Sequence, residues 1–101
     1  MVITVLEAQV APAQEPALQA AYREAAQAPF PRGLVRSALL RTTSDRTLWR
    51  IETLWESRDA LEAMRGTGTP RGILIFRAAG AEPTLTVLEV IAELSPPQGA
   101  A

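Results

Sequence analysis

Apolar and polar residues alternate along the first stretch of the chain, and this alternation predicts a β-strand. It covers residues 2–10, is rich in β-branched side chains and stops at Ala11-Pro12. The next stretch, residues 13–28, is rich in alanine, and its larger apolar side chains recur at the spacing of a helix. Pro16 fits the first turn of this helix. Two prolines and a glycine then stop it: Pro29, Pro31 and Gly33.

Two further alternating stretches, residues 34–42 and 47–55, predict a β-hairpin. The polar residues between them, Thr43-Ser44-Asp45, are typical of a turn. Ser57 is placed to cap a second helix, because its side chain can accept a hydrogen bond from a backbone N–H of the first turn. Gly66 ends that helix.

The remainder of the chain predicts a loop and a last strand. Residues 67–72 are rich in glycine and threonine and are expected to form the loop. Residues 73–79 suit a strand at their start and a helix at their end, so both interpretations stay open. A strong strand pattern covers residues 84–94, directly after Pro83.

The order of these elements is β-α-β-β-α-β, which is the ferredoxin-like split βαβ arrangement. The predicted fold class is therefore α+β, a four-stranded antiparallel sheet with both helices on one side. We expect one domain over residues 1–95 and a frayed C-terminal tail over residues 96–101.

Alternation within each strand sorts the sheet residues into two sets. One predicted face holds Val2, Leu6, Trp49, Ile51, Trp55, Leu88 and Val90. The other predicted face holds Ile3, Val5, Glu7, Leu48, Arg50, Glu52, Leu54, Leu85, Val87, Glu89 and Ile91. The helices can cover only one face, and the second is more apolar than an ordinary exposed patch. We therefore expect a homodimer in which two sheets face each other, because this buries the second face.

The residue types that the chain lacks exclude several kinds of site. Among its 101 residues there is no Cys, His, Lys or Asn. A zinc site, a Ser-His-Asp triad and a lysine Schiff base are therefore excluded. Haem would lack its usual His or Cys axial ligand. We expect no bound metal and no cofactor, and any proton chemistry must use Asp, Glu, Tyr22, the N-terminus or the substrate.

Charge and hydropathy exclude two classes of partner. All ten basic residues are Arg, they form no cluster, and the sequence pI is about 5.4. Nucleic-acid binding is not expected, since it normally shows as a basic patch. No apolar run approaches the ~18 residues of a membrane span. The first residues have no basic flank, so we expect a soluble cytoplasmic protein without a signal peptide.

Aromatic residues give the first candidate site. Trp49 and Trp55 share one face of a predicted strand, and Tyr22 lies on the buried side of the first helix. They could form a flat apolar slot for a planar ligand, whereas the alternative for each residue is ordinary core packing. Position in the predicted fold adds three residues to the candidate ligand pocket: Thr4, Thr53 and Phe76.

Charged residues on the second face give another candidate site. In a dimer, Glu7, Arg50, Glu52 and Glu89 would lie inside the barrel. Carboxylates held close together there could carry out acid–base chemistry. The alternative, which we favour, is that Arg50 pairs with a neighbouring glutamate and water fills the rest. The glycines at residues 66–72 do not match a dinucleotide-binding loop, because this segment follows a helix; we expect a mobile connection that acts as a lid.

Residues 49–61, WRIETLWESRDAL, resemble the signature of the antibiotic biosynthesis monooxygenase domain family. The order of elements is similar over residues 2–94. The resemblance implies a dimeric α+β barrel with a ligand pocket in each subunit beside Trp55. One branch of the family oxidises polycyclic phenols or quinols with O2 and no cofactor. Another degrades haem with an Asn, the Trp and a His, and of these only Trp55 is present here.

Three functions follow as hypotheses. The first is a cofactor-independent monooxygenase in which Trp55 and Trp49 stack on an aromatic substrate, Tyr22 or Thr53 binds its oxygen, and Arg77 or an arginine at the pocket mouth stabilises the phenolate. The second is a non-catalytic small-molecule binder or stress-related barrel. The third is an isomerase or lactone-handling enzyme that depends on the charged face. Haem degradation is not expected, because His and Asn are absent.

Overall fold

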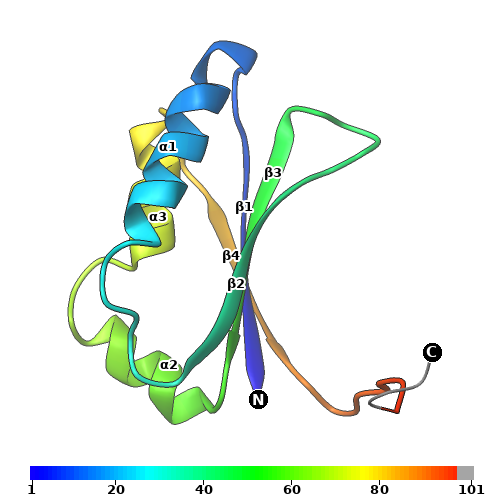
Figure 1. Ribbon diagram of the computed structural model, residues 1–101. Helices are drawn as coiled ribbons and strands as arrows, with labels where there is room; N and C mark the ends of the chain where they lie inside the picture. The colour runs from blue at the N-terminus through cyan, green and yellow to red at the C-terminus, as the bar shows by residue number, and fades with distance from the viewer. Residues whose placement is uncertain (98–101) are drawn as a thin grey trace.

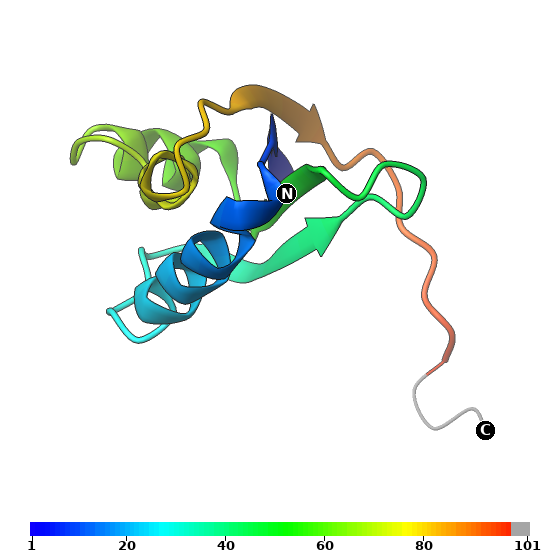
Figure 2. The same ribbon diagram turned by 90° about the horizontal axis from the view of Figure 1, so that it is seen from above.

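The computed structural model describes residues 1–97 and shows a sheet with a layer of helices on one side (Figure 1, Figure 2). Its elements in chain order are β1 (Val2–Gln9), a short 3-10 turn η1 (Pro12–Gln14), α1 (Glu15–Ala25), β2 (Leu34–Arg41), β3 (Leu48–Trp55), α2 (Arg58–Arg65), α3 (Arg71–Ala78) and β4 (Thr84–Glu89). The sheet order is β2-β3-β1-β4, and every neighbouring pair is antiparallel. This confirms the ferredoxin-like α+β fold.

Local signals in the sequence set the bounds of the first two helices. Pro16 lies in the first turn of α1, as predicted. Ser57 caps α2, since its Oγ accepts a hydrogen bond from the N–H of Ala60 at 3.1 Å, and Gly66 ends the helix.

Residues 73–78 of the ambiguous segment are helical and belong to α3, and Ala79 caps the end of this helix. Ile75, Phe76 and Ala79 are buried, and together with Gly72 they recur at the spacing of one helix face. Gly72 lets this face approach the sheet closely, because a Cβ at that position would lie 2.5 Å from Cδ1 of Leu6. The helix also takes Arg71 and Gly72 from the predicted loop.

The predicted last strand is five residues too long, because β4 ends at Glu89 rather than Leu94. Glu89 lies opposite Val2, the first residue of β1. The N–H of Val90 still donates to the carbonyl of Met1 at 3.0 Å. After Val90, no residue of β1 remains that could pair with the segment that follows β4. The chain then runs away from the sheet (Figure 1).

The predicted division of the two faces is wrong for β4. Leu85, Val87 and Glu89 lie opposite Leu6, Thr4 and Val2, and so share the helix-covered side with them. Leu88 lies opposite Ile3 on the other side, here called the open face. Alternation sorts the residues of one strand into two sets, but only the register between strands decides which sets share a face.

The core lies between the helices and the covered face of the sheet. Its larger cluster contains Leu18 of α1, Phe76 of α3, and Trp49 and Ile51 of β3. A smaller cluster at the other end of the sheet joins residues of β1, β3 and α2: Val2, Trp55 and Leu61. No helix within residues 1–97 is long and apolar enough to cross a membrane.

Candidate functional site

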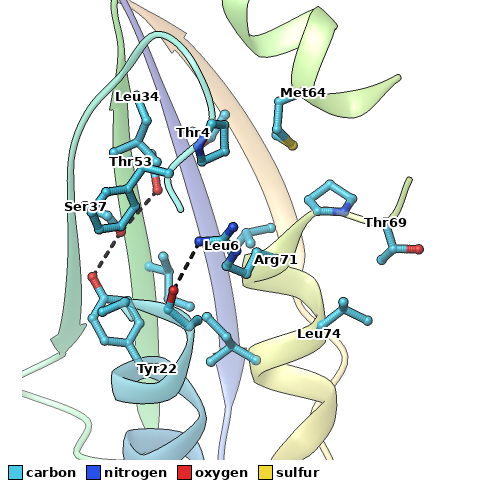
Figure 3. A pocket seen from close by; sticks show the side chains of 18 of the residues that line it. Thr4, Leu6, Tyr22, Leu34, Ser37, Thr53, Met64, Thr69, Arg71 and Leu74 are labelled. Atoms are coloured by element: carbon cyan, nitrogen blue, oxygen red, sulfur yellow. Dashed lines mark hydrogen bonds between the residues drawn. The ribbon is translucent and has the colours of Figure 1, made fainter. Parts of the chain in front are cut away.

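A pocket of about 320 Å³ lies between the helices and the covered face of the sheet (Figure 3). Its floor comes from β1, β2 and β3, and its walls come from α1, α3, Met64 of α2 and the loops next to these helices. Most of the lining is apolar, and Leu6, Leu34, Ile51, Leu74 and Ile75 are among its residues. This is the composition of a small-molecule site, and the volume is at the low end of the usual ~300–1,000 Å³.

Four hydroxyl groups cross this apolar floor in a line, here called the hydroxyl row: Thr4, Thr53, Ser37 and Tyr22. Strand register creates it, because Thr4 lies opposite Thr53 and Thr53 lies opposite Ser37. The Ser37 Oγ accepts hydrogen bonds from the hydroxyls of Tyr22, at 3.0 Å, and Thr53, at 3.3 Å (Figure 3). Ser37 therefore retains its own hydroxyl hydrogen for a ligand oxygen.

Trp55 fixes one end of the hydroxyl row. The residue is 3% exposed and forms part of the pocket lining, and its Nε1–H donates to the Thr4 Oγ1 at 3.1 Å. This bond satisfies the buried indole donor and orients the Thr4 hydroxyl. The structure therefore brings together Trp55, Thr4, Thr53 and Tyr22, four of the six residues predicted for the pocket.

Arg71 forms a cationic part of the pocket wall. It is the first residue of α3, and its guanidinium donates from Nη1 to the carbonyl of Ala25, at 3.1 Å, and from Nη2 to that of Pro29, at 2.8 Å. These bonds attach α3 to the end of α1 and to the loop that follows it. The Ala25 carbonyl is available because the last carbonyls of a helix receive no N–H from within that helix. Arg71 was not predicted as a site residue, because its stretch of sequence has the pattern of a loop.

The loop between α2 and α3 forms another part of the wall. Thr67, Thr69 and Pro70 line the pocket. The Thr67 hydroxyl donates to the carbonyl of Met64 at 2.7 Å, which holds the start of this loop on the end of α2. Phe30, on the loop after α1, completes the lining and is 61% exposed.

Trp49 and Phe76, the other two predicted pocket residues, lie outside this lining. Phe76 is fully buried in the core. Trp49 instead borders a separate outer groove between α1 and β2, where the Arg41 guanidinium lies 5.3 Å from its ring centre. Trp49 and Trp55 share a face of β3, as predicted, but they lie six positions apart along the strand, so Trp55 reaches the pocket and Trp49 the outer groove.

The predicted charged set does not gather at one place. Arg50 forms an ion pair with Glu7, its partner in register, on the open face. Glu52 lies on the same face, opposite Val5. Glu89 is on the helix-covered side instead, and its carboxylate is 3.9 Å from the guanidinium of Arg58.

Arg77, the arginine proposed for the phenolate, also lies outside the pocket lining. Its guanidinium holds Glu82, with the closest N–O distance 2.8 Å, and this hydrogen bonding lowers the pKa of the Glu82 carboxyl below its ordinary value. Within residues 1–97, no three acidic side chains come together in a way that could hold a metal ion.

The sequence matches the family model described as antibiotic biosynthesis monooxygenase (ABM) over residues 1–71. The chain belongs to this family. The match extends from β1 to the first residue of α3, so it includes the hydroxyl row, Trp55 and Arg71. It confirms the resemblance at residues 49–61.

Solved structures share the fold of this ABM chain. A candidate antibiotic biosynthesis monooxygenase from Deinococcus radiodurans is similar with a TM-score of 0.74 and 15% identity, over 95% of this chain and 98% of that one. The haem degrader MhuD from Mycobacterium tuberculosis, with two haems in its active site, has a TM-score of 0.71 and 23% identity, over 94% and 100%. SnoaB, a cofactor-independent oxygenase from Streptomyces nogalater, has a TM-score of 0.68 and 18% identity, over 94% and 97%.

At these identities the likeness to solved structures shows the fold alone. No curated protein matches the chain. The pocket is therefore the feature of this ABM protein that indicates an activity.

Proposed function

We propose that this ABM protein is a cofactor-independent monooxygenase of electron-rich aromatic small molecules of the phenol, quinol or anthrone type. The observation that carries the proposal is an apolar pocket crossed by the hydroxyl row, with the Arg71 guanidinium in its wall. Its volume of about 320 Å³ suits a compact ligand of a few fused rings.

The polar groups of the pocket favour an anionic ligand. Within the described residues its lining contains hydroxyls, one indole and one guanidinium, and no Asp or Glu. Such a site stabilises a phenolate or enolate more than the neutral parent, since its donors are fixed before the charge develops. A ligand that fills the apolar pocket would displace water from its polar groups, which would strengthen these interactions further.

An anthrone shows how the reaction balances without a cofactor. Its CH2 group loses a proton to water, and the negative charge of the resulting enolate rests on an oxygen held by the hydroxyl row and Arg71. The anion transfers one electron to O2, and the two radicals combine to form a peroxide on that carbon. The peroxide takes up a proton and loses water to leave a carbonyl group. One CH2 group and one O2 thus give one C=O group and one H2O, with every electron supplied by the substrate.

The residues of the pocket do not fit haem. A haem iron needs an axial ligand, and the lining side chains that could approach one are the Tyr22 phenol and the Met64 thioether. The Tyr22 hydroxyl is already held by Ser37. The proposed function therefore uses no haem.

The proposed enzyme is a homodimer that buries its open face. That face carries apolar side chains from all four strands, among them Ile3, Val5, Leu40, Leu48, Leu54 and Leu88. Leu40 and Leu88 are 39% and 48% exposed in the single chain. A second copy of the same sheet would remove this apolar surface from water.

Oxygen uptake with anthrone tests the proposed activity, with two tryptophan variants as a matched pair. We expect uptake above the protein-free rate and at least a tenfold lower kcat/KM in Trp55→Phe, which loses the bond to Thr4. Trp49→Phe makes the same substitution outside the pocket. It should stay within about twofold of the unchanged protein, because the Trp49 Nε1–H has no hydrogen-bond partner among the described residues and so no such bond is lost.

Absence of uptake above the protein-free rate would contradict the proposed activity. If anthrone then still quenched the fluorescence of Trp55, the family fold would serve as a binding module for aromatic molecules.

A further inference from the structure

The outer groove that Trp49 borders is a second cavity, and the proposed oxidation does not use it. It lies between α1 and the strands β2 and β3, and its volume is about 560 Å³. This volume is within the usual range of a small-molecule site. The groove is therefore large enough for a ligand of its own.

Two guanidinium groups make the lining of the outer groove positively charged. Arg23 of α1 and Arg41 of β2 both line it, and the lining contains no Asp or Glu. Gln19 lies one helical turn before Arg23 on the same side of α1, and its amide adds further N–H donors. The groove thus gathers hydrogen-bond donors from a helix and a strand around one space.

The two arginines keep donors for a ligand. The closest contact of Arg41 with a carboxylate is from its Nη1 to Oε1 of Glu15 at 4.0 Å, which is too long for a hydrogen bond. Arg23 forms no ion pair with a carboxylate of residues 1–97. The Arg41 guanidinium also lies over the Trp49 ring, which restricts the orientation of its planar group before any ligand arrives.

Apolar side chains lie beside these charges. Ser37, Leu39 and Arg41 occupy alternate positions of β2 and so share its helix-covered side. Leu39 and the ring of Tyr22 give the groove an apolar surface next to the guanidiniums. An inorganic anion would leave this surface in contact with water, whereas an anion with an apolar body would cover it.

The outer groove meets the pocket at one hydrogen bond. Tyr22 and Ser37 line both cavities, and the Tyr22 hydroxyl donates to the Ser37 Oγ at 3.0 Å. The arginines of the two cavities are different, because Arg71 lines only the pocket and Arg23 and Arg41 line only the groove. Substitution of these arginines can therefore distinguish a ligand of the groove from a ligand of the pocket.

We propose that the outer groove binds a small organic carboxylate with an apolar body, such as an aromatic acid, through Arg23 and Arg41. Two guanidiniums can hold both oxygens of one carboxylate, and such charge-assisted hydrogen bonds are roughly twice as strong as neutral ones. The site goes beyond the proposed function, because oxidation of anthrone in the pocket does not require a second ligand.

Isothermal titration calorimetry with 2-naphthoate tests the site, with 2-naphthamide as the uncharged analogue of the same shape. We expect 2-naphthoate to bind at low ionic strength and 2-naphthamide to bind at least about tenfold more weakly, since the amide lacks the charge. The affinity for 2-naphthoate should fall as NaCl is added, because salt screens exposed charges.

Arginine variants locate the ligand. Arg23→Gln and Arg41→Gln should each raise the Kd of 2-naphthoate at least about fivefold, because each removes one charged partner. Both side chains are on the surface, and the distant contact of Arg41 with Glu15 contributes little to stability, so both variants should fold. Arg46→Gln removes the same charge from the turn between β2 and β3, outside the groove, and should stay within about twofold of the natural chain.

Arg71→Gln separates the groove from the pocket. Thermal melts first establish that this variant is folded at the temperature of the titration. It should keep the binding that depends on Arg23 and Arg41, and if the natural chain binds a second equivalent in the pocket, only that one should be lost.

Three outcomes would overturn the inference. One is no heat of binding at millimolar 2-naphthoate, and another is equal affinity for 2-naphthamide. The third is binding that Arg71→Gln weakens while Arg23→Gln and Arg41→Gln leave it unchanged, since the ligand would then occupy the pocket. None of these outcomes involves oxygen uptake, so the failure of this inference and the failure of the proposed function are distinguishable.

Discussion

The Ser37 hydroxyl has the most consequential position of any single group in the pocket. It accepts from Tyr22 on a helix and from Thr53 on the neighbouring strand, and so connects the two layers across the ligand space. Replacing Tyr22 with Phe keeps the ring and removes one donor. We expect an oxygen-uptake kcat/KM at least tenfold lower and a free energy of unfolding lower by only about 1 kcal/mol.

Kinetics and thermal melts of the Tyr22→Phe protein together check this expectation. An unchanged kcat/KM would show that the hydroxyl row serves packing and does not act on the substrate.

Asp45 makes the stability of the β2–β3 turn depend on pH. Its carboxylate accepts hydrogen bonds from the side-chain hydroxyl and then the backbone N–H of Thr47, and these lower its pKa below the ordinary value of about 3.9. A lowered pKa in the folded protein means that the stabilisation is present above the ordinary pKa and is lost as the pH falls through the folded one. The Tm difference between the natural protein and Asp45→Ala should therefore be constant at neutral pH and shrink below pH about 4. A difference that grows in acid would be inconsistent with this.

Local residue chemistry was enough to predict several features. Ser57, Gly66 and Pro16 act through neighbours in the chain, so their roles as cap, stop and first-turn residue could be predicted. Ser37 and Arg71 line the pocket but were not predicted as site residues. Their partners lie 15 to 46 residues away in the sequence, and no local pattern encodes such contacts.

Among the elements, the junction between the loop before β2 and helix α2 is the tightest. Gly33 has φ +86°, and a Cβ there would lie 2.4 Å from the Cβ of Ala60. Its carbonyl also accepts from the N–H of Glu56 at 2.8 Å. Gly33→Ala combines backbone strain with the close contact to the Ala60 Cβ. We expect the free energy of unfolding to fall by at least about 2 kcal/mol, which corresponds to a Tm lower by roughly 10 °C.

Gly80→Ala is the matched control for Gly33→Ala in thermal melts. Its φ of +71° imposes similar strain, but nothing lies within 4 Å of the added Cβ. It should cost about 1 kcal/mol. Equal losses in the two variants would mean that α2 shifts to accommodate the methyl group.

The type of an element could be predicted where its pattern of apolar residues runs over many positions. The residues at which elements begin and end could not. Residues 73–79 could not be resolved because a short apolar run suits either a strand or a helix. The end of β4 could not be predicted because it is set by the first residue of β1, far away in the sequence. The register between β4 and β1 also joins residues far apart in the sequence. The two faces of β4 were therefore assigned the wrong way round from the sequence.

At the scale of the whole molecule, helices cover one side of the sheet and none covers the other. The helices bury the covered face over β1 and β3 and form walls of the pocket, while the open face and the β2 edge present apolar or unpaired groups in the single chain. The fold class could be predicted because the element order alone specifies it. The pocket depends on side chains from three strands, three helices and their loops, and only Trp55 was marked by a motif.

Product labelling under ¹⁸O2 tests the central claim most directly. The protein, purified without added metal, is given anthrone, and the quinone formed in a short reaction is analysed by mass spectrometry. We predict one ¹⁸O atom in the new carbonyl group, formed faster than in protein-free solution and much more slowly by Trp55→Phe. A product that forms only at the protein-free rate, or that takes its oxygen from labelled water, would contradict the assignment of this pocket as an oxygenase site.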